Sequence, residues 1–279
     1  MRIKHRYILN NGEKDILAFL DKMKIKYDKN EIITVFEIYE DDRDYMAIKA
    51  FMTSKGNESI GREAVYTIEE INEAQWLAVR SSWVSLYPHP REDMKYRFTT
   101  YDATDYCEGS RPKYYCNKGS IQKEDFAFEK KPNWGPRNFL MINWVADELF
   151  ISEKAVDILK ASNLKGFKIM DVMTKSRNIM DGVKQLFVES YLDKGLCPET
   201  IRETLVCPKC GFEKYIPVAG PFSYRKEAFE AVDKDIVKTE EKFGGVMCFS
   251  YIIVTQRFRE LLANSKLDRG LVYEPVKLV

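Results

Sequence analysis

Two segments of the chain repeat the same pattern of apolar and polar positions. In each, a short apolar run ends at a hydroxyl residue, Ser152 or Thr255, and apolar residues follow at helical spacing up to a glycine. Alternating apolar residues come after Gly166 and Gly270. Apolar positions at i, i+3 and i+4 predict a helix with one buried face, and alternation predicts a strand. Each segment therefore predicts a strand, a helix and a second strand.

The residues that separate these elements agree with this interpretation. Ser and Thr are preferred N-caps because the hydroxyl accepts a hydrogen bond from an N–H group of the first helical turn. Glycine suits the left-handed position that ends many helices, so we expect Gly166 and Gly270 to cap the two helices. One strand-helix-strand unit cannot cover its own sheet, so we expect both copies to share a core. The prediction is a duplicated domain with units of about 107–175 and 205–279.

The first third of the chain has a different pattern. Apolar spacing predicts a helix over residues 12–24, and β-rich runs predict strands over 31–39 and 45–52. Thr67 and Glu70 have the spacing of a capping box, which predicts a short helix.

A polar, proline-rich segment over residues 87–93 marks the expected domain boundary. We therefore expect a small N-terminal α/β domain over residues 1–90 and the duplicated domain over 91–279. The fold class is a mixture of α/β and α+β.

Composition adds limits on function. The 279 residues include 44 basic and 43 acidic side chains, for a net charge of +1, which does not favour a phosphate-binding face. We see no apolar run long enough for a membrane helix and no secretory signal behind the first residues. Six cysteines in such a chain are typical of reduced thiols in the cytoplasm.

The clearest chemical signal is the sequence Cys207-Pro-Lys-Cys210-Gly211. Two thiolates at this spacing, followed by glycine, can bend around one soft cation as a zinc-ribbon-like knuckle. This is half of a tetrahedral site. A redox role is the weaker alternative, because the pair does not open a helix after a strand.

Cys107 and Cys116 are the best candidates for the other half. The segment 114–119 looks like a second CxxCG that has lost one cysteine, and Cys107 lies nine residues before Cys116. We expect a structural zinc held by Cys207, Cys210, Cys107 and Cys116. The alternative is a ribbon whose glycine turn survives without metal. Cys197 and Cys248 have no partner at metal spacing, and we expect them to be buried.

Catalytic residues are harder to find. His5 and His89 are the only histidines, and His89 lies between two prolines. A hydrolytic triad is difficult to build from so few imidazoles. We do not expect an enzyme, nor a small-molecule substrate.

Tyrosines are concentrated in the centre of the chain. Six of the 16 fall within 29 residues: Tyr87, Tyr96, Tyr101, Tyr106, Tyr114 and Tyr115. Tyrosine gives a large contact area at low entropic cost and is enriched at protein interfaces. We expect Tyr101, Tyr106, Tyr114 and Tyr115 to contact a partner protein; the alternative is that these rings pack beneath the metal loops.

A resemblance can be stated on the order of the motifs. They are Tyr101-Asp102, Cys116, Gln122, Lys131-Pro-Asn-Trp-Gly135, Asn143-Trp-Val145, Asp147-Glu148, Cys207-x-x-Cys210-Gly211 and Lys238-Thr-Glu-Glu-Lys-Phe-Gly244. This order, over residues 76–279, resembles that of bacterial double-CxxCG proteins. The family is often assigned as immunity proteins of polymorphic or contact-dependent toxin systems. The first pair departs from the family pattern because only Cys116 remains.

The resemblance implies a non-catalytic, cytoplasmic, immunity-like protein that binds and neutralises a partner toxin. The alternative is a zinc-ribbon nucleic-acid-binding protein, for which four basic residues lie near the knuckle: Lys209, Lys214, Arg225 and Lys226. Balanced charge disfavours this alternative because nonspecific nucleic-acid affinity depends on phosphate neutralisation.

Overall fold

The structure is a computed structural model that describes residues 1–92, 95–102, 121–245 and 248–279. The chain forms two compact units. The smaller contains Met1–Glu70 and Ala219–Pro221, and the larger contains Ile71–Val218 and Phe222–Val279. The division therefore falls earlier in the chain than the boundary expected at residue 90.

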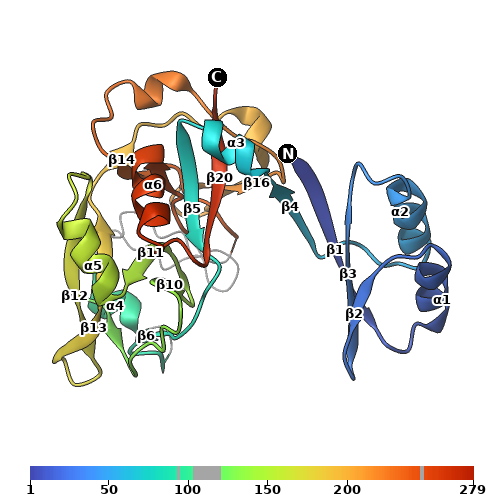
Figure 1. Cartoon of the computed structure of the whole chain (residues 1–279), viewed down its shortest axis with the longest axis horizontal. Helices are drawn as coiled ribbons and strands as arrows, with labels where there is room; N and C mark the ends of the chain where they lie inside the picture. Colours follow the sequence, from blue (N-terminus) through green and yellow to red (C-terminus); the bar gives the residue numbers. More distant parts are fainter. Residues whose placement is uncertain (93–94, 103–120, 246–247) are drawn as a thin grey trace. The chain divides into compact units, whose positions relative to one another are not determined.

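The smaller unit is an antiparallel sheet with two helices on one side (Figure 1). The strand order is β2-β3-β1-β4. The elements are β1 (Arg2–Asn10), α1 (Lys14–Lys22), β2 (Tyr27–Lys29), β3 (Ile33–Tyr39), α2 (Tyr45–Ser54) and β4 (Gly61–Val65). Its core joins alternate residues of β1 and β3, such as Tyr7 and Phe36, to the apolar face of α1. The helix predicted over residues 12–24 is confirmed as α1, and the strand predicted over 31–39 is confirmed as β3.

The prediction of a strand over residues 45–52 is wrong. This segment forms α2, and Tyr45, Ile48 and Met52 are its buried residues. Their spacing of three and four residues places them on one helical face that packs in the core of the unit. Tyr45, Ile48 and Phe51 favour a strand, but the other residues of the segment are strong helix formers, so local propensity and burial both favour the helix.

The capping box at the next helix is confirmed. The side chain of Glu70 accepts from the Thr67 N–H at 2.8 Å, and the Thr67 hydroxyl accepts from the Glu70 N–H at 3.2 Å. These bonds open α3 (Ile68–Glu73).

In its described part, the larger unit has two six-stranded sheets and two small ladders (Figure 1). The first sheet has the order β10-β11-β13-β12-β9-β6 and the second has the order β14-β18-β19-β5-β20-β17. The strands of the first are β6 (Pro88–His89), β9 (Ala127–Phe128), β10 (Phe139–Ile142), β11 (Val145–Ile151), β12 (Phe167–Thr174) and β13 (Ile179–Val188). Those of the second are β5 (Trp76–Ser81), β14 (Tyr191–Leu192), β17 (Phe222–Tyr224), β18 (Ile236–Thr239), β19 (Ile252–Thr255) and β20 (Leu271–Leu278). The fold is thus a mixed α+β fold dominated by strands.

The remaining elements connect these sheets. The two ladders are β7 (Tyr101–Asp102) with β8 (Ile121–Gln122), and β15 (Ile201–Val206) with β16 (Glu213–Pro217). The helices are α4 (Tyr96–Thr100), α5 (Glu153–Lys160), α6 (Gln256–Asn264) and the short 3₁₀ turns η3 (Pro198–Thr200) and η4 (Lys226–Phe229). Among the described residues, no helix has the length and apolar character needed to span a lipid bilayer.

The two large sheets have matching connections. In the first, β11, α5 and β12 follow one another, and both strands pair antiparallel with β13 between them. In the second, β19, α6 and β20 follow one another, and both strands pair antiparallel with β5. The outer neighbours also correspond: β10 and β18 are antiparallel to β11 and β19, whereas β9 and β17 are parallel to β12 and β20. Among these five strands of each sheet, the central one comes from a different place in the chain, and the sixth strands, β6 and β14, lie at opposite ends.

The predicted N-caps are confirmed at both helices. Ser152 accepts from the N–H of Ala155, and Thr255 accepts from the N–H of Phe258, each at 3.3 Å. The predicted role of the glycines as helix caps is wrong. The helices end earlier, at Lys160 and Asn264, and Gly166 and Gly270 instead open β12 and β20 with φ of +103° and +89°.

The apolar faces of both helices lie in one core. This cluster contains Leu159 of α5 and Phe258 of α6, together with residues of β5, β11, β13 and β19. The expectation that the two strand-helix-strand segments share a core is therefore confirmed.

Candidate functional site

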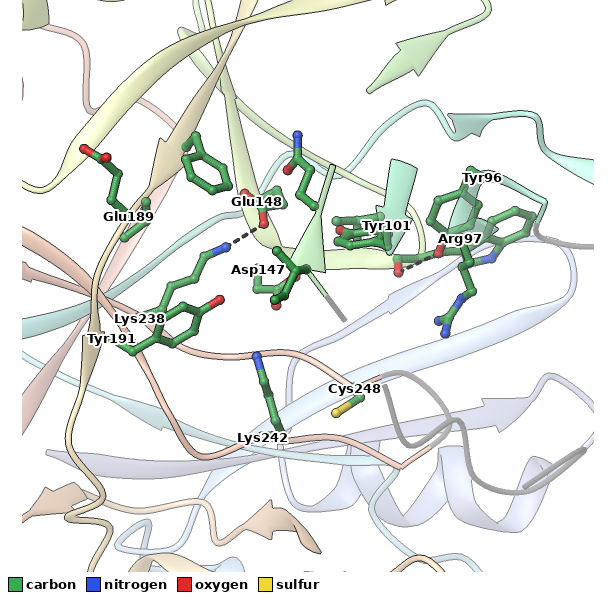
Figure 2. A pocket seen from close by; sticks show the side chains of 16 residues that line it. Tyr96, Arg97, Tyr101, Asp147, Glu148, Glu189, Tyr191, Lys238, Lys242 and Cys248 are labelled. Carbon is green, nitrogen blue, oxygen red and sulfur yellow. Dashed lines mark hydrogen bonds and ion pairs between the residues drawn. The ribbon is translucent and has the colours of Figure 1, made fainter. Parts of the chain in front are cut away.

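A cavity of about 280 Å³ lies in the larger unit, where strands of both large sheets meet the β7–β8 ladder. Its described lining residues come from segments far apart in the sequence (Figure 2). They are Tyr96, Arg97, Tyr101, Ile121, Gln122, Trp144, Val145, Asp147, Glu148, Phe187, Val188, Glu189, Tyr191, Lys238, Lys242 and Cys248.

A buried ion pair forms one end of this lining. Nζ of Lys238, on β18, lies 2.5 Å from Oε1 of Glu148, on β11, so the pair connects the two sheets. The Lys238 and Glu148 side chains are only 3% and 5% exposed. Each charge has left water and depends on the other for compensation.

Both members of the pair have shifted pKa values. Burial raises the pKa of Glu148, and the carboxylate of Asp147 adds to this rise against the opposing effect of Lys238. Burial alone lowers the pKa of Lys238, but Glu148 and Asp147 outweigh it and the net direction is upward. The lysine is therefore held as a cation.

A chain of hydrogen bonds runs from this pair to the β7–β8 ladder. Nε2 of Gln185 lies 3.0 Å from Oε2 of Glu148, and the side-chain amides of Gln185 and Gln122 bond to each other at 2.8 Å. Gln122 is the register partner of Tyr101 in the ladder. Burial raises the pKa of Tyr101 well above its usual value, and the carboxylates of Glu148 and Asp147 add to the rise. The buried pair thus helps to fix the position and the protonation of Tyr101.

A second pair of opposite charges meets at Ser250. Nζ of Lys242 donates to Oγ of Ser250 at 2.7 Å, and the Ser250 N–H donates to Oδ2 of Asp147 at 3.2 Å. The Lys242 ammonium also lies 5.3 Å from the centre of the Tyr191 ring. Figure 2 shows Lys242 directed toward the part of the cavity that contains Asp147.

Aromatic rings form the opposite side. Trp144 has φ of +71°, as the turn between β10 and β11 requires, and its ring stacks on Tyr96 at an interplanar angle of 17°. Tyr101 packs edge-on against Phe126. Elsewhere in the lining, Ile121 and Tyr191 are 69% and 52% exposed. The cavity therefore combines a polar floor, aromatic walls and apolar side chains open to solvent.

Part of the motif set on which the sequence resemblance rests lines this cavity, whereas the motifs at 131–135 and 207–211 lie outside its described lining. Eight motif residues line it: Tyr101, Gln122, Trp144, Val145, Asp147, Glu148, Lys238 and Lys242. Of these eight, the sequence interpretation gave a role only to Tyr101, as a partner-contacting residue. A signal was available, because Glu148 and Lys238 each interrupt an apolar strand, and a charged residue in such a run calls for a partner.

The neighbouring motif residue Glu241 has a supporting role. One of its carboxylate oxygens accepts the N–H groups of Gly195 and Leu196 at 2.8 and 3.0 Å, and the other accepts the hydroxyl of Tyr224. These bonds fasten the loop before η3 to the end of β18.

Cys207 and Cys210 lie at the tip of the β15–β16 hairpin. The Gly211 N–H donates to the Cys207 carbonyl at 2.9 Å, and Gly211 has φ of +70°. Cys207 is 4% exposed, Cys210 is half-buried, and both pack with Phe212. The two predicted ligands therefore sit together on one tight turn.

The other predicted site residues lie outside the described residues: Cys107, Cys116, Tyr106, Tyr114 and Tyr115. Within the described part of the chain, no three His, Cys, Asp or Glu side chains group as metal ligands would. Cys197 and Cys248 are buried, as expected.

Two of the basic residues near the hairpin have bonds within the unit. Lys214 is buried and donates to the carbonyl of Gly245, and Arg225 donates to the carbonyl of Lys194 at 2.8 Å. This weakens the sequence argument for a phosphate-binding face at the hairpin.

His5 belongs to the core of the smaller unit. Its Nε2 lies 2.8 Å from Oε1 of Glu40 and 3.0 Å from the Tyr45 hydroxyl, and its Nδ1 lies 3.2 Å from Oγ of Ser59. Arg62 binds the same Glu40 oxygen at 2.6 Å. These contacts tie β1 to the elements around it.

Comparison with known proteins finds no family that matches this chain and no curated protein with significant similarity to it.

Proposed function

We propose that this chain is a non-catalytic, immunity-like protein of the cytoplasm that binds and neutralises a partner toxin. The observation that carries the proposal is the convergence of eight motif residues on one cavity with Ile121 and Tyr191 exposed around it. Aromatic and apolar side chains beside a structured polar floor are typical of a protein-binding hot spot. Tyr101 then contributes to the binding surface from within the cavity lining.

The binding surface is tested by replacing exposed apolar residues. We expect Ile121→Asp and Tyr191→Asp to abolish protection when the chain is expressed with a toxin encoded beside its gene. Ile179→Asp is the matched control, because Ile179 is 55% exposed in the same unit but does not line the cavity. Growth and co-purification are measured together. Full protection by both cavity variants, or the absence of any protein partner, would contradict the proposal.

We further propose that the β15–β16 hairpin carries a structural zinc. Cys207 and Cys210 have the donor type and turn geometry that suit it, and Cys107 and Cys116 would complete four sulfur ligands. Zinc would hold the hairpin tip in place without entering any reaction.

The larger unit is also proposed to be an internal duplication. The shared order of strand, helix and strand and the matching pairings of the outer strands support this origin. In the first sheet the central strand, β13, follows β12 in the chain. In the second sheet β5, from earlier in the chain, takes the central position that a strand after β20 would have by analogy.

A further inference from the structure

The charges around the cavity balance each other. The described lining has three cationic side chains and three carboxylates. Lys238 and Glu148 compensate each other at 2.5 Å, and Glu189 is paired with Lys168 at 2.6 Å. Arg97 lies beside Tyr96, away from the lysines in Figure 2. The central part of the cavity is left with Lys242 and Asp147.

These two groups are of opposite sign and share Ser250 as a hydrogen-bond partner. Both bind Ser250, one through its hydroxyl and one through its backbone N–H. A ligand with a net charge is attracted by one of them and repelled by the other. A neutral group that offers an acceptor beside a donor can bind the Lys242 ammonium and the Asp147 carboxylate together.

The aromatic side of the cavity also restricts the shape of a ligand. Tyr96, Tyr101 and Trp144 present aromatic surface to a space of about 280 Å³. Flat aromatic groups pack well against such rings. Small-ligand sites combine this kind of apolar lining with a few placed polar groups.

We propose that this cavity is a binding site for a small planar ligand with an uncharged carboxamide-like group. The carbonyl oxygen accepts from Lys242, the amide nitrogen donates to Asp147, and the ring lies among the tyrosines and Trp144. This site is separate from, and additional to, the proposed binding of a toxin through the exposed side chains.

Three probes of nearly the same shape test the charge preference: benzamide, benzoate and benzamidine. Binding to the purified full chain is measured by calorimetry or ligand-observed NMR at millimolar concentrations. We expect benzamide to bind at least threefold more tightly than either charged probe. A smaller preference, a preference for benzoate or benzamidine, or no binding of benzamide would overturn the proposal.

Two variants then locate the contacts. Lys242→Met leaves Asp147 as the dominant charge, so the preference should move toward benzamidine by threefold or more. Asp147→Asn has the opposite effect and should move it toward benzoate. Lys184→Met, which changes a lysine outside the lining, is the control and should leave the order unchanged. Unchanged preferences in both cavity variants, with native circular dichroism, would place the probes elsewhere and also overturn the proposal. Because no partner protein is present, failure here is distinct from failure of toxin neutralisation.

Discussion

Lys238 and Glu148 join the two large sheets of the larger unit through one buried ion pair, 2.5 Å between Nζ and Oε1. The same glutamate accepts from Gln185, whose amide is bonded to Gln122 of the β7–β8 ladder. A contact between sheets is thereby linked to the position of Tyr101 at the cavity.

Removing only the cation should strongly destabilise the unit. Lys238→Met leaves a buried carboxylate without compensation, and we expect a loss of about 3–5 kcal/mol in the free energy of unfolding. The double variant Lys238→Met with Glu148→Gln removes both charges and keeps an acceptor for Gln185. It should recover most of the loss in urea unfolding experiments.

A half-buried ion pair on the first large sheet, which also contains Glu148, provides the control. Lys184 and Asp171 are 2.7 Å apart, with side chains 21% and 39% exposed. We expect Lys184→Met to cost less than about 1 kcal/mol. A cost for Lys238→Met no larger than this would show that the buried pair has little effect on stability.

The two equivalent glycines should differ in their tolerance of alanine. A Cβ at Gly166 would collide with the carbonyl oxygen of Ile236, whereas at Gly270 the nearest atom is Cδ of Arg137 at 3.5 Å. Both have positive φ, which costs alanine about 1–2 kcal/mol. We expect Gly270→Ala to lose only this amount and Gly166→Ala to lose clearly more, as measured by thermal unfolding. Equal losses of stability would indicate that β18, which contains Ile236, moves away from the added Cβ at no cost in free energy.

Stability should fall in alkali partly because of Cys248. Burial raises the pKa of its thiol from 9.0 to about 11. Below pH 9 the thiol is neutral in both states; between pH 9 and 11 the unfolded chain loses the proton while the folded chain retains it. Folding therefore loses up to about 2.7 kcal/mol as pH rises through this window.

Cys248→Ala removes that contribution. The difference in unfolding free energy between the two proteins should change with pH from 9 to 11 and be flat below 9. Tyr224, whose pKa burial also raises, affects both proteins alike and cancels in the difference. A difference that does not depend on pH would contradict the assignment.

Metal content tests the hairpin separately. We expect about one zinc per chain by elemental analysis after purification without chelator, and its loss in Cys207→Ser. Cys197→Ser changes another buried thiol and should retain the metal. Equal metal content in the two variants would exclude Cys207 as a ligand.

Local pattern was enough to predict several elements of this fold. The N-caps at Ser152 and Thr255 and the capping box at Thr67 depend on residues three apart, so the sequence contains all the information needed. The strand expected over residues 45–52 is an error of weighting, because the helical spacing of Tyr45, Ile48 and Met52 is already present in the sequence.

The cavity could not be predicted in the same way. Glu148 and Lys238 are ninety residues apart, and nothing in either strand identifies the other as its partner. The same holds for β5, whose neighbours β19 and β20 lie near the other end of the chain. Local sequence can indicate that a buried charge needs compensation, but only the tertiary fold identifies the group that provides it.

The place of β5 in the second sheet has a consequence for biosynthesis. A ribosome makes residues 76–81 early, but Leu77 pairs with Val254 and with Pro275. This strand, nearly all of which becomes buried, must therefore remain without its neighbours until residues 252–278 have been made. Synthesis of β19 and β20, rather than emergence of the first unit, sets the earliest moment at which the second sheet can close.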